Sequence, residues 1–258
     1  MRRMLAVATL SGLLVAGGCS TPPEAAQQDE SHQTGAEEVQ QDQEAVDAVW
    51  ATFEEEFNQI RTDAPPLGEG DDEQTIDRLQ YLMVRDQFWR EKLHQLAKLD
   101  VDTVERQALM ERLAERMHDV DAENTAELQD YLDDHPWPCK QQLGEQADQA
   151  AWMIVQHADH DPGFQTEVLE MLEELVDEER TAPERYAMLY DRVAVAEDRP
   201  QRYGSQGQCK PDGTWEMFEV EDPEGLDERR TRKGLEPMEL HRPVVEELCE
   251  PEPSAGDD

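Results

Sequence analysis

The chain has 258 residues, of which 62 are acidic and 23 basic, and its formal net charge is −39 at pH 7. This length suffices for one domain with a hydrophobic core and a long tether. A field of this sign repels nucleic acid and anionic lipid, so we expect the chain to bind neither directly. Many acidic residues with little Lys are typical of a salt-adapted, cell-exterior protein, because salt screens self-repulsion. The alternative is a merely acidic, highly soluble surface.

The N-terminus predicts a lipoprotein signal. Arg2 and Arg3 precede a short apolar segment at residues 5–15, which is the pattern of a cleaved secretory signal. The following V-A-G-G-C resembles a bacterial lipobox, which implies cleavage before Cys19 and lipidation of that cysteine. Ser20 stands where an Asp retains many lipoproteins at the inner membrane, so we expect an anchor in the outer membrane, facing the periplasm. We expect the lipid to be the chain's only attachment to the membrane.

The hydrophobic pattern predicts a mainly α fold, a multi-helix domain with a small C-terminal β-hairpin. The predicted regions are a signal peptide at 1–18, a disordered tether at 19–42, an N-terminal helical region at 43–118, a motif-bearing helical domain with the hairpin at 119–240, and an acidic tail at 241–258.

Apolar residues at helical spacing predict the elements in chain order. We expect helices at about residues 44–60, 73–99, 101–117, 123–132 and 144–159. Asp102 and Glu105 cap the third of them. Asp161 and Pro162 are the expected N-cap and first residue of the next helix.

The last third of the chain contains clear turn and cap signals. The segment from Thr181 to Glu184 has the pattern of a capping box, and the helix that it heads is expected to run through Asp191. Asp212-Gly213 predicts the turn of the hairpin. The segment D-P-E-G-L-D-E-R-R then predicts one short helix.

Two histidines and two aspartates occur within five positions of V-Q-H-A-D-H-D-P. On one continued helix, His157, His160 and Asp161 could share a face and bind a transition metal. The alternative that we favour is a helix junction, because Asp161-Pro162 requires a helix break. A polar binding or catalytic site without metal is the third alternative. We predict no metal and no cofactor.

Three further motifs have a structural interpretation, and two of them also have a functional one. Trp137, between two prolines, either anchors a loop on the core or forms the wall of a binding cleft. The loop Q-R-Y-G-S-Q either satisfies buried backbone groups or recognises a peptide or sugar. Asp191-Arg192 indicates an internal ion pair that organises this loop.

Five blocks of sequence occur in an order that resembles a bacterial domain family of unknown function. They are N-T-A-E-L, W-P, A-A-W-M-I-V-Q-H-A-D-H-D-P-G-F-Q, L-Y-D-R-V-A-V and Q-R-Y-G-S-Q. The resemblance covers about Asp119 to Leu240, and the chain departs from the family's pattern at Pro136, Cys139 and Ser205. It implies that the following residues converge in the fold: Trp137, Gln156, His157, Asp159, Asp161, Gln165, Asp191, Arg192, Tyr203 and Gln206.

Three cysteines remain after cleavage at Cys19, and an oxidising compartment permits one disulfide. Cys139 and Cys209 both lie beside the motifs, so we expect these two to pair. The departures from the family's pattern fit a disulfide that joins the two motif loops. Cys249 is then the odd thiol.

Two classes of function remain open. The first, which we prefer, is a binding or interaction module for an envelope protein or a small ligand, with Trp137, Gln156, Gln165 and Gln206 as binding residues. The second is a hydrolase-like enzyme in which His157 acts as general base or metal ligand. Its supporting residues would be Asp159 or Asp191 to orient His157, and Tyr203 or Arg192 to stabilise charge. This enzyme requires His157, Asp191 and Tyr203 in one open cleft.

Overall fold

The computed structural model describes residues 42–96 and 98–249. Cys19 and residues 1–41, which cover the predicted signal peptide and nearly all of the tether, lie outside the described residues. The chain divides into two units, Met1–Glu44 and Ala45–Asp258, and the fold below is that of the second. No helix in the described part of the chain has the length and apolar character needed to cross a bilayer.

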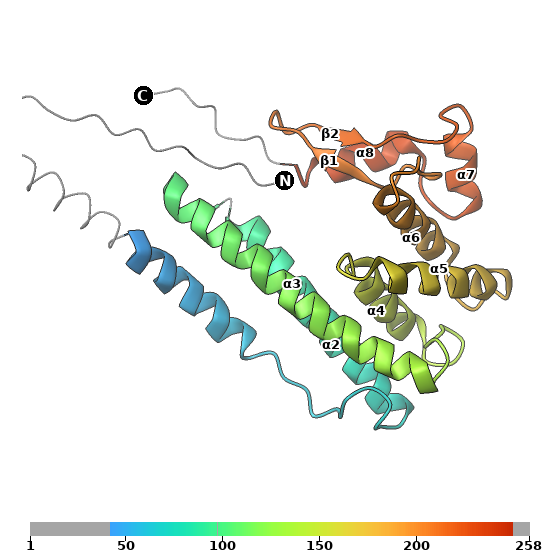
Figure 1. The fold of residues 1–258 in the computed structure, drawn as a ribbon, viewed down its shortest axis with the longest axis horizontal. Coiled ribbons are helices and arrows are strands. Elements are labelled where there is room, and N and C mark those ends of the chain that lie inside the picture. Colours follow the sequence, from blue (N-terminus) through green and yellow to red (C-terminus); the bar gives the residue numbers. More distant parts are fainter. Residues whose placement is uncertain (1–41, 97, 250–258) are drawn as a thin grey trace, which may run out of the picture. The chain divides into compact units, whose positions relative to one another are not determined.

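The prediction of a mainly helical fold with a small hairpin is confirmed (Figure 1). The helices are a first one at residues 42–57, then α2 (Asp72–Leu96), α3 (Thr103–Asp134), α4 (Glu145–Gln156), α5 (Pro162–Asp177), α6 (Pro183–Ala196), α7 (Leu226–Arg232) and α8 (Met238–Glu246). The strands are β1 (Gly207–Cys209) and β2 (Trp215–Met217).

Helix α3 is one continuous helix of 32 residues, whereas two helices were predicted for this segment. The predicted capping box at its start is confirmed, since Asp102 and Glu105 each accept a hydrogen bond from the other's backbone N–H. Between residues 117 and 123 the chain has neither Gly nor Pro, so nothing interrupts the helical hydrogen bonds. The polar segment H-D-V-D-A is therefore helical.

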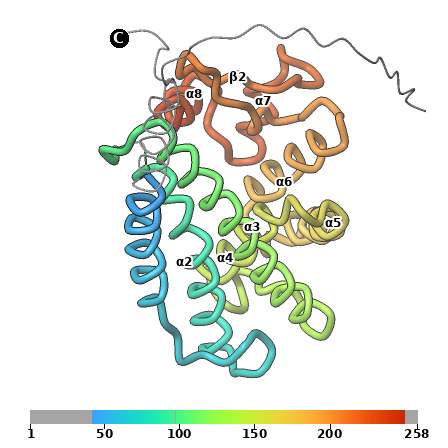
Figure 2. Tube along the Cα trace, turned by 60° about the vertical axis from the view of Figure 1, so that its left-hand side comes forward, coloured from blue at the N-terminus to red at the C-terminus, as the bar shows by residue number. Residues whose placement is uncertain are grey.

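Helices α2 and α3 are antiparallel neighbours (Figure 2). They carry two separate apolar clusters. At one end, Trp89 and Leu113 pack with Phe53 and Phe57 of the first helix. At the other end, Leu82 and Leu128 join the larger cluster that α4, α5 and α6 complete. The small residues of α4, Ala147, Ala150 and Ala151, are fully buried, so the neighbouring helices approach its backbone closely.

The N-caps of α5 and α6 differ from each other. At α5 the prediction is confirmed, because Asp161 accepts the backbone N–H of Phe164 and Pro162 is the first helical residue. At α6 the predicted capping box is wrong, because the cap residue is Ala182 and no side chain bonds the first turn. The hydroxyl of Thr181 is instead buried against a carboxylate of α4.

The hairpin turns at the predicted place, and Gly213 has a φ of +80° there. The predicted Cys139–Cys209 disulfide is wrong. Cys209 at the end of β1 bonds Cys249, just beyond α8, and Cys139 is a buried free thiol. Helix α8, which was not predicted, packs against β2 and brings Cys249 to the hairpin. Cys139 lies in the larger apolar cluster, away from that contact.

Candidate functional site

Trp137 anchors its loop on the core, and it does not line a cleft. Its side chain is buried, and its indole N–H donates to Asp148 Oδ1 at 2.7 Å. The hydroxyl of Thr181 and the guanidinium of Arg185 donate to the same carboxylate. Three donors thus satisfy one buried anion, and this contact joins the loop before α4 to the start of α6.

Asp191 organises the Q-R-Y-G-S-Q loop through backbone groups. Its two oxygens accept the N–H groups of Arg202 (2.8 Å), Tyr203 (2.9 Å) and Ser205 (2.8 Å). The side chain of Gln201 also bonds backbone groups. Its Oε1 accepts the backbone N–H of Gln206, and its Nε2 donates to the backbone carbonyl of Gln206. The interpretation that this loop satisfies buried backbone is therefore confirmed for Asp191 and Gln201.

The predicted ion pair between Asp191 and Arg192 is wrong. Arg192 instead contacts residues at and just after the C-terminal end of α4. Its guanidinium donates to Asp159 at 2.7 and 2.8 Å and to Gln156 Oε1 at 3.1 Å. Gln165 also donates to Oδ1 of Asp159, at 3.1 Å. Burial would raise the pKa of Asp159, but the charge and hydrogen bonds of Arg192 outweigh it, so that pKa is lowered.

The proposed metal set His157, His160 and Asp161 does not converge. Asp161 is committed to its N-cap role and also accepts the amide of Gln129 at 2.9 Å. His160 is exposed and lies against the ring of His118, with centroids 5.7 Å apart. The segment is the helix junction that we favoured.

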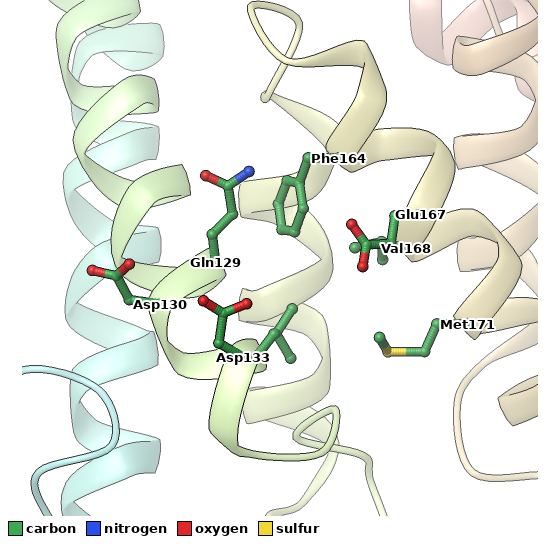
Figure 3. A pocket seen from close by; sticks show the side chains of 8 residues that line it. Gln129, Asp130, Asp133, Phe164, Glu167, Val168 and Met171 are labelled. Carbon is green, nitrogen blue, oxygen red and sulfur yellow. The ribbon is translucent and has the colours of Figure 1, made fainter.

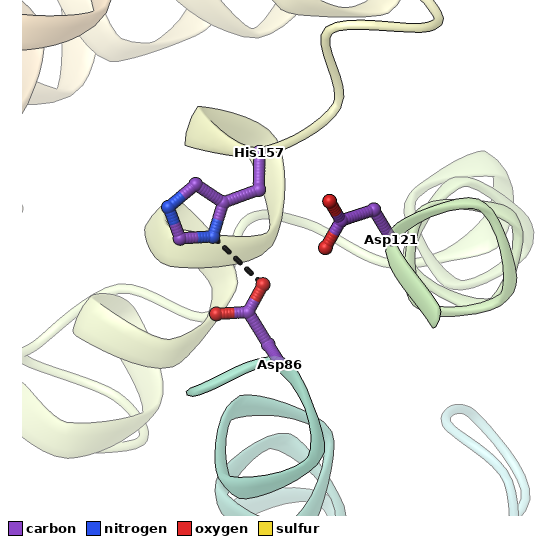
Figure 4. Close-up of side chains that lie close together, drawn as sticks. All are labelled: Asp86, Asp121 and His157. Atoms are coloured by element: carbon purple, nitrogen blue, oxygen red, sulfur yellow. Dashed lines mark hydrogen bonds and ion pairs between the residues drawn. The ribbon is translucent and has the colours of Figure 1, made fainter. Parts of the chain in front are cut away.

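His157 faces two aspartates that sequence analysis did not select (Figure 4). Its Nδ1 lies 2.7 Å from Oδ1 of Asp86 in α2. Arg90 donates to this carboxylate at 2.8 Å and to both oxygens of Asp121 in α3, at 2.8 and 3.1 Å. The side chains of Asp86, Asp121 and His157 are 1%, 11% and 18% exposed. We call Asp86, Arg90, Asp121 and His157 the His157 cluster.

The two aspartates of the His157 cluster have opposite pKa shifts. Burial would raise the pKa of Asp86, but hydrogen bonding and charge from His157, with Arg90, lower it overall. Burial also raises the pKa of Asp121, and there the hydrogen bond and charge of Arg90 do not offset it. Asp86 therefore stays ionised more readily than Asp121.

A signal for Asp86 was present in the sequence. Leu82, Asp86 and Trp89 occupy positions i, i+4 and i+7 of α2, so the aspartate interrupts a buried stripe. A charge in such a place needs a partner from another helix. The sequence of α2 could not identify this partner, because His157 lies 71 positions from Asp86.

The enzyme hypothesis required His157, Asp191 and Tyr203 in one cleft, and the structure does not assemble this set. Asp86 orients His157, and both oxygens of Asp191 are occupied by the loop. Tyr203 is buried at 4% exposure. The predicted binding residues Trp137, Gln156 and Gln165 are buried as well, and Gln206 is half-buried in the same loop as Tyr203.

Two surface depressions differ in charge. The first lies between α3 and α5 (Figure 3) and has a volume of about 360 Å³; its lining includes Asp130, Asp133, Glu167, Phe164 and Met171. Its acidic lining matches the net charge of the whole chain. The second has a volume of about 280 Å³, and we call it the basic pocket. It is lined by Arg202, Tyr203, Arg229, Arg232 and Lys233.

The basic pocket has four cationic side chains around one tyrosine. Arg202 belongs to the Q-R-Y-G-S-Q loop, and its guanidinium lies 4.7 Å from the ring centroid of Tyr190. Arg229 of α7 donates to the backbone carbonyl of Arg202 at 2.8 Å, which ties the helix to the loop. Lys233 caps the C-terminal end of α7, and its Nζ lies 4.6 Å from the ring centroid of Tyr186.

Comparison with known protein families gives a match. The model of a family of unknown function, DUF6624, matches residues 84–249. This range includes the His157 cluster, the basic pocket and Cys249, and it extends beyond the stretch from Asp119 to Leu240 on which the resemblance was based. No curated protein and no solved structure matches the chain. Since the match covers well over half of the sequence, the chain belongs to the family of unknown function DUF6624.

Proposed function

We propose that this chain is an envelope lipoprotein whose helical domain binds an anionic ligand in the basic pocket. One observation carries the proposal: four cationic side chains line a single pocket in a chain with a net charge of −39. The 23 basic residues are outnumbered almost threefold, so this concentration contrasts with the rest of the chain. Three of these cations already have carboxylate partners: Arg202 pairs with Glu221, Arg229 with Asp222 and Arg232 with Glu228. An anion in the pocket would compete with these exposed carboxylates for the arginines, but not for Lys233.

The pocket combines exposed cationic side chains with a tyrosine that is held in place by its loop. Arg232 pairs with Glu228, and its side chain is 65% exposed, so it is free to reorient toward a ligand. For Lys233 the described residues include no carboxylate within ion-pair distance. Tyr203 is held at the bottom by the backbone contacts of Asp191. The ligand class is therefore a carboxylate or phosphate group on a small molecule or peptide, bound by charge-assisted hydrogen bonds.

The placement at the envelope rests on the N-terminal sequence. The apolar segment after Arg2 and Arg3, followed by V-A-G-G-C, supports export and lipidation at Cys19. The absence of Asp after Cys19 supports the outer membrane, facing the periplasm. A tether from Cys19 to the first helix would let the pocket meet soluble ligands some distance from the anionic membrane surface.

Calorimetric titration of the full chain tests the pocket, with inorganic phosphate and succinate as separate probes. We expect saturable binding of at least one probe, and the stronger one distinguishes phosphate from carboxylate recognition. Lys233→Ala should weaken this binding by about ten- to a hundredfold, since a charge-assisted hydrogen bond contributes about 1.5–3 kcal/mol. Added NaCl should weaken it too.

Lys210→Ala is the matched control, because it removes the same charge from the hairpin, where Lys210 pairs with Glu216. Its affinity should equal that of the wild type. The proposal is wrong if neither probe binds saturably, or if the two lysine variants lose affinity equally. The second result would show that only the general charge matters.

A further inference from the structure

The His157 cluster brings together the side-chain types that bind transition metals. Asp86, Asp121 and His157 come from α2, α3 and the C-terminal end of α4, and Figure 4 shows them pointing toward one another. One carboxylate oxygen from each aspartate and one ring nitrogen of His157 all lie within 4.8 Å of one another. Three helices that the core holds in place therefore supply three donor atoms to one point.

The two carboxylates already share a cation. Arg90 donates to Asp86 at 2.8 Å and to Asp121 at 2.8 Å, so its guanidinium bridges them. Two buried carboxylates so close together require such a positive charge, because their mutual repulsion is poorly screened. A dication between the two carboxylates would supply twice the positive charge of Arg90. The side chain of Arg90 is 25% exposed, so it has a route to solvent.

We propose that Asp86, Asp121 and His157 bind one divalent transition-metal ion of the zinc class, which displaces Arg90 from between the carboxylates. An imidazole nitrogen with two carboxylate oxygens suits zinc and its neighbours in the first row. Calcium and magnesium prefer ligand sets made entirely of oxygen. Three protein ligands leave a fourth position for water or a further ligand. The site shares no residue with the basic pocket, so it goes beyond the proposed function.

Zinc titration of the metal-stripped full chain tests this proposal, with equilibrium dialysis and elemental mass spectrometry as the readout. We expect the wild type to bind one equivalent. Asp121→Asn, which keeps the shape but removes the charge, should weaken binding at least tenfold. Arg90→Met should bind zinc at least as tightly as the wild type, because the competing cation is gone. A purely structural cluster predicts the reverse for Arg90→Met, namely lower stability and no zinc.

His160→Ala and Asp161→Asn are the matched controls, because they change the neighbouring residues that the cluster does not use. Their zinc affinity should equal that of the wild type. Two readouts do not depend on the folding of Asp121→Asn. They are the Arg90→Met titration and the spectrum of the cobalt-loaded wild type, which should show d–d bands without a thiolate charge-transfer band. The proposal is overturned if the wild type binds less than one equivalent, if His160→Ala abolishes binding, or if a thiolate band shows that a cysteine binds the metal.

Discussion

His157 Nδ1 lies 2.7 Å from Asp86 Oδ1, and this contact joins the C-terminal end of α4 to the middle of α2. His157 is the C-cap of α4, where the carbonyl ends of the helix favour positive charge. Asp86 thus holds the ring of His157 at this end of the helix. Because Arg90 joins Asp86 to Asp121, α2, α3 and α4 all meet at this cluster. The helices are thus connected by polar contacts as well as by the apolar core.

Replacing Glu127 by Gln should reduce stability in a pH-dependent way. Glu127 accepts two hydrogen bonds from Arg78 and one from the N–H of Leu67. Burial would raise its pKa, but these contacts lower it below the ordinary 4.5. The native state then binds fewer protons than the unfolded state, so the stabilisation is complete above about pH 4.5. It is lost as pH falls through the folded pKa.

Urea denaturation at pH 7 and at pH 3 measures this effect. At pH 7 we expect Glu127→Gln to cost about 1–2 kcal/mol, and the difference from wild type should shrink at pH 3. The control is Glu123→Gln, whose carboxylate is 55% exposed, and it should stay within about 0.5 kcal/mol of wild type. A difference that does not change with pH would contradict the assigned role of the carboxylate charge.

Asp191→Asn should loosen the Q-R-Y-G-S-Q loop. The new amide group faces backbone N–H donors, so at least one of them loses its acceptor, at a cost of about 2–3 kcal/mol. Hydrogen exchange should accelerate at the amides of Arg202, Tyr203 and Ser205. Asp134→Asn, at the exposed end of α3, should leave these rates unchanged. Unchanged exchange in Asp191→Asn would mean that other contacts hold the loop.

The disulfide can be identified by mass mapping of non-reduced peptides, which should show Cys209 joined to Cys249 and a free thiol at Cys139. Removing the bridge with Cys249→Ala should cost up to about 4 kcal/mol on a loop-entropy estimate for this chain separation. Cys139→Ala should leave the bridged peptide intact. A peptide that joins Cys139 to Cys209 would restore the original prediction and contradict the structure.

Cys19→Ser should abolish lipidation. We expect the wild type to incorporate labelled palmitate and to sediment with outer membranes in a bacterial host, and the variant to do neither. Ser20→Asp is an informative second variant, because it should move the protein to the inner membrane while lipidation persists. Incorporation of label by Cys19→Ser would show that another group is modified.

Sequence periodicity predicted those features that depend on neighbours within one helix. Asp102 and Asp161 were identified as caps because the relevant contacts span three residues. Thr181 was misassigned because a buried carboxylate in another helix competes for its hydroxyl. The partner of Cys209 was likewise missed, since it depends on α8 packing against β2. Contacts between distant segments are determined by packing, which local patterns do not contain.

The same distinction applies to the candidate sites. His157 was selected from its local pattern, but its partners Asp86 and Asp121 lie in other helices. Tyr203 was also selected, and it lines the basic pocket together with arginines of α7. The sequence of α7 had predicted a short helix but no site. Trp137, Gln156 and Gln165 were selected for their chemistry and proved to be buried. Residue type therefore identified candidate polar side chains. Only the fold showed which of them are accessible to a ligand and which are buried and stabilise the structure.

The shared carboxylate of Asp148 couples four positions energetically. Trp137, Thr181 and Arg185 all donate to it, so losing Asp148 alone leaves three buried donors with no common acceptor. Losing Trp137 or Thr181 leaves two donors, whereas losing Arg185 removes the cation that faces this buried carboxylate. Free energies of single substitutions at these positions will consequently not add, and the second change will be cheaper than the first. A redesign of this corner of the core would therefore have to replace the four side chains together rather than one at a time.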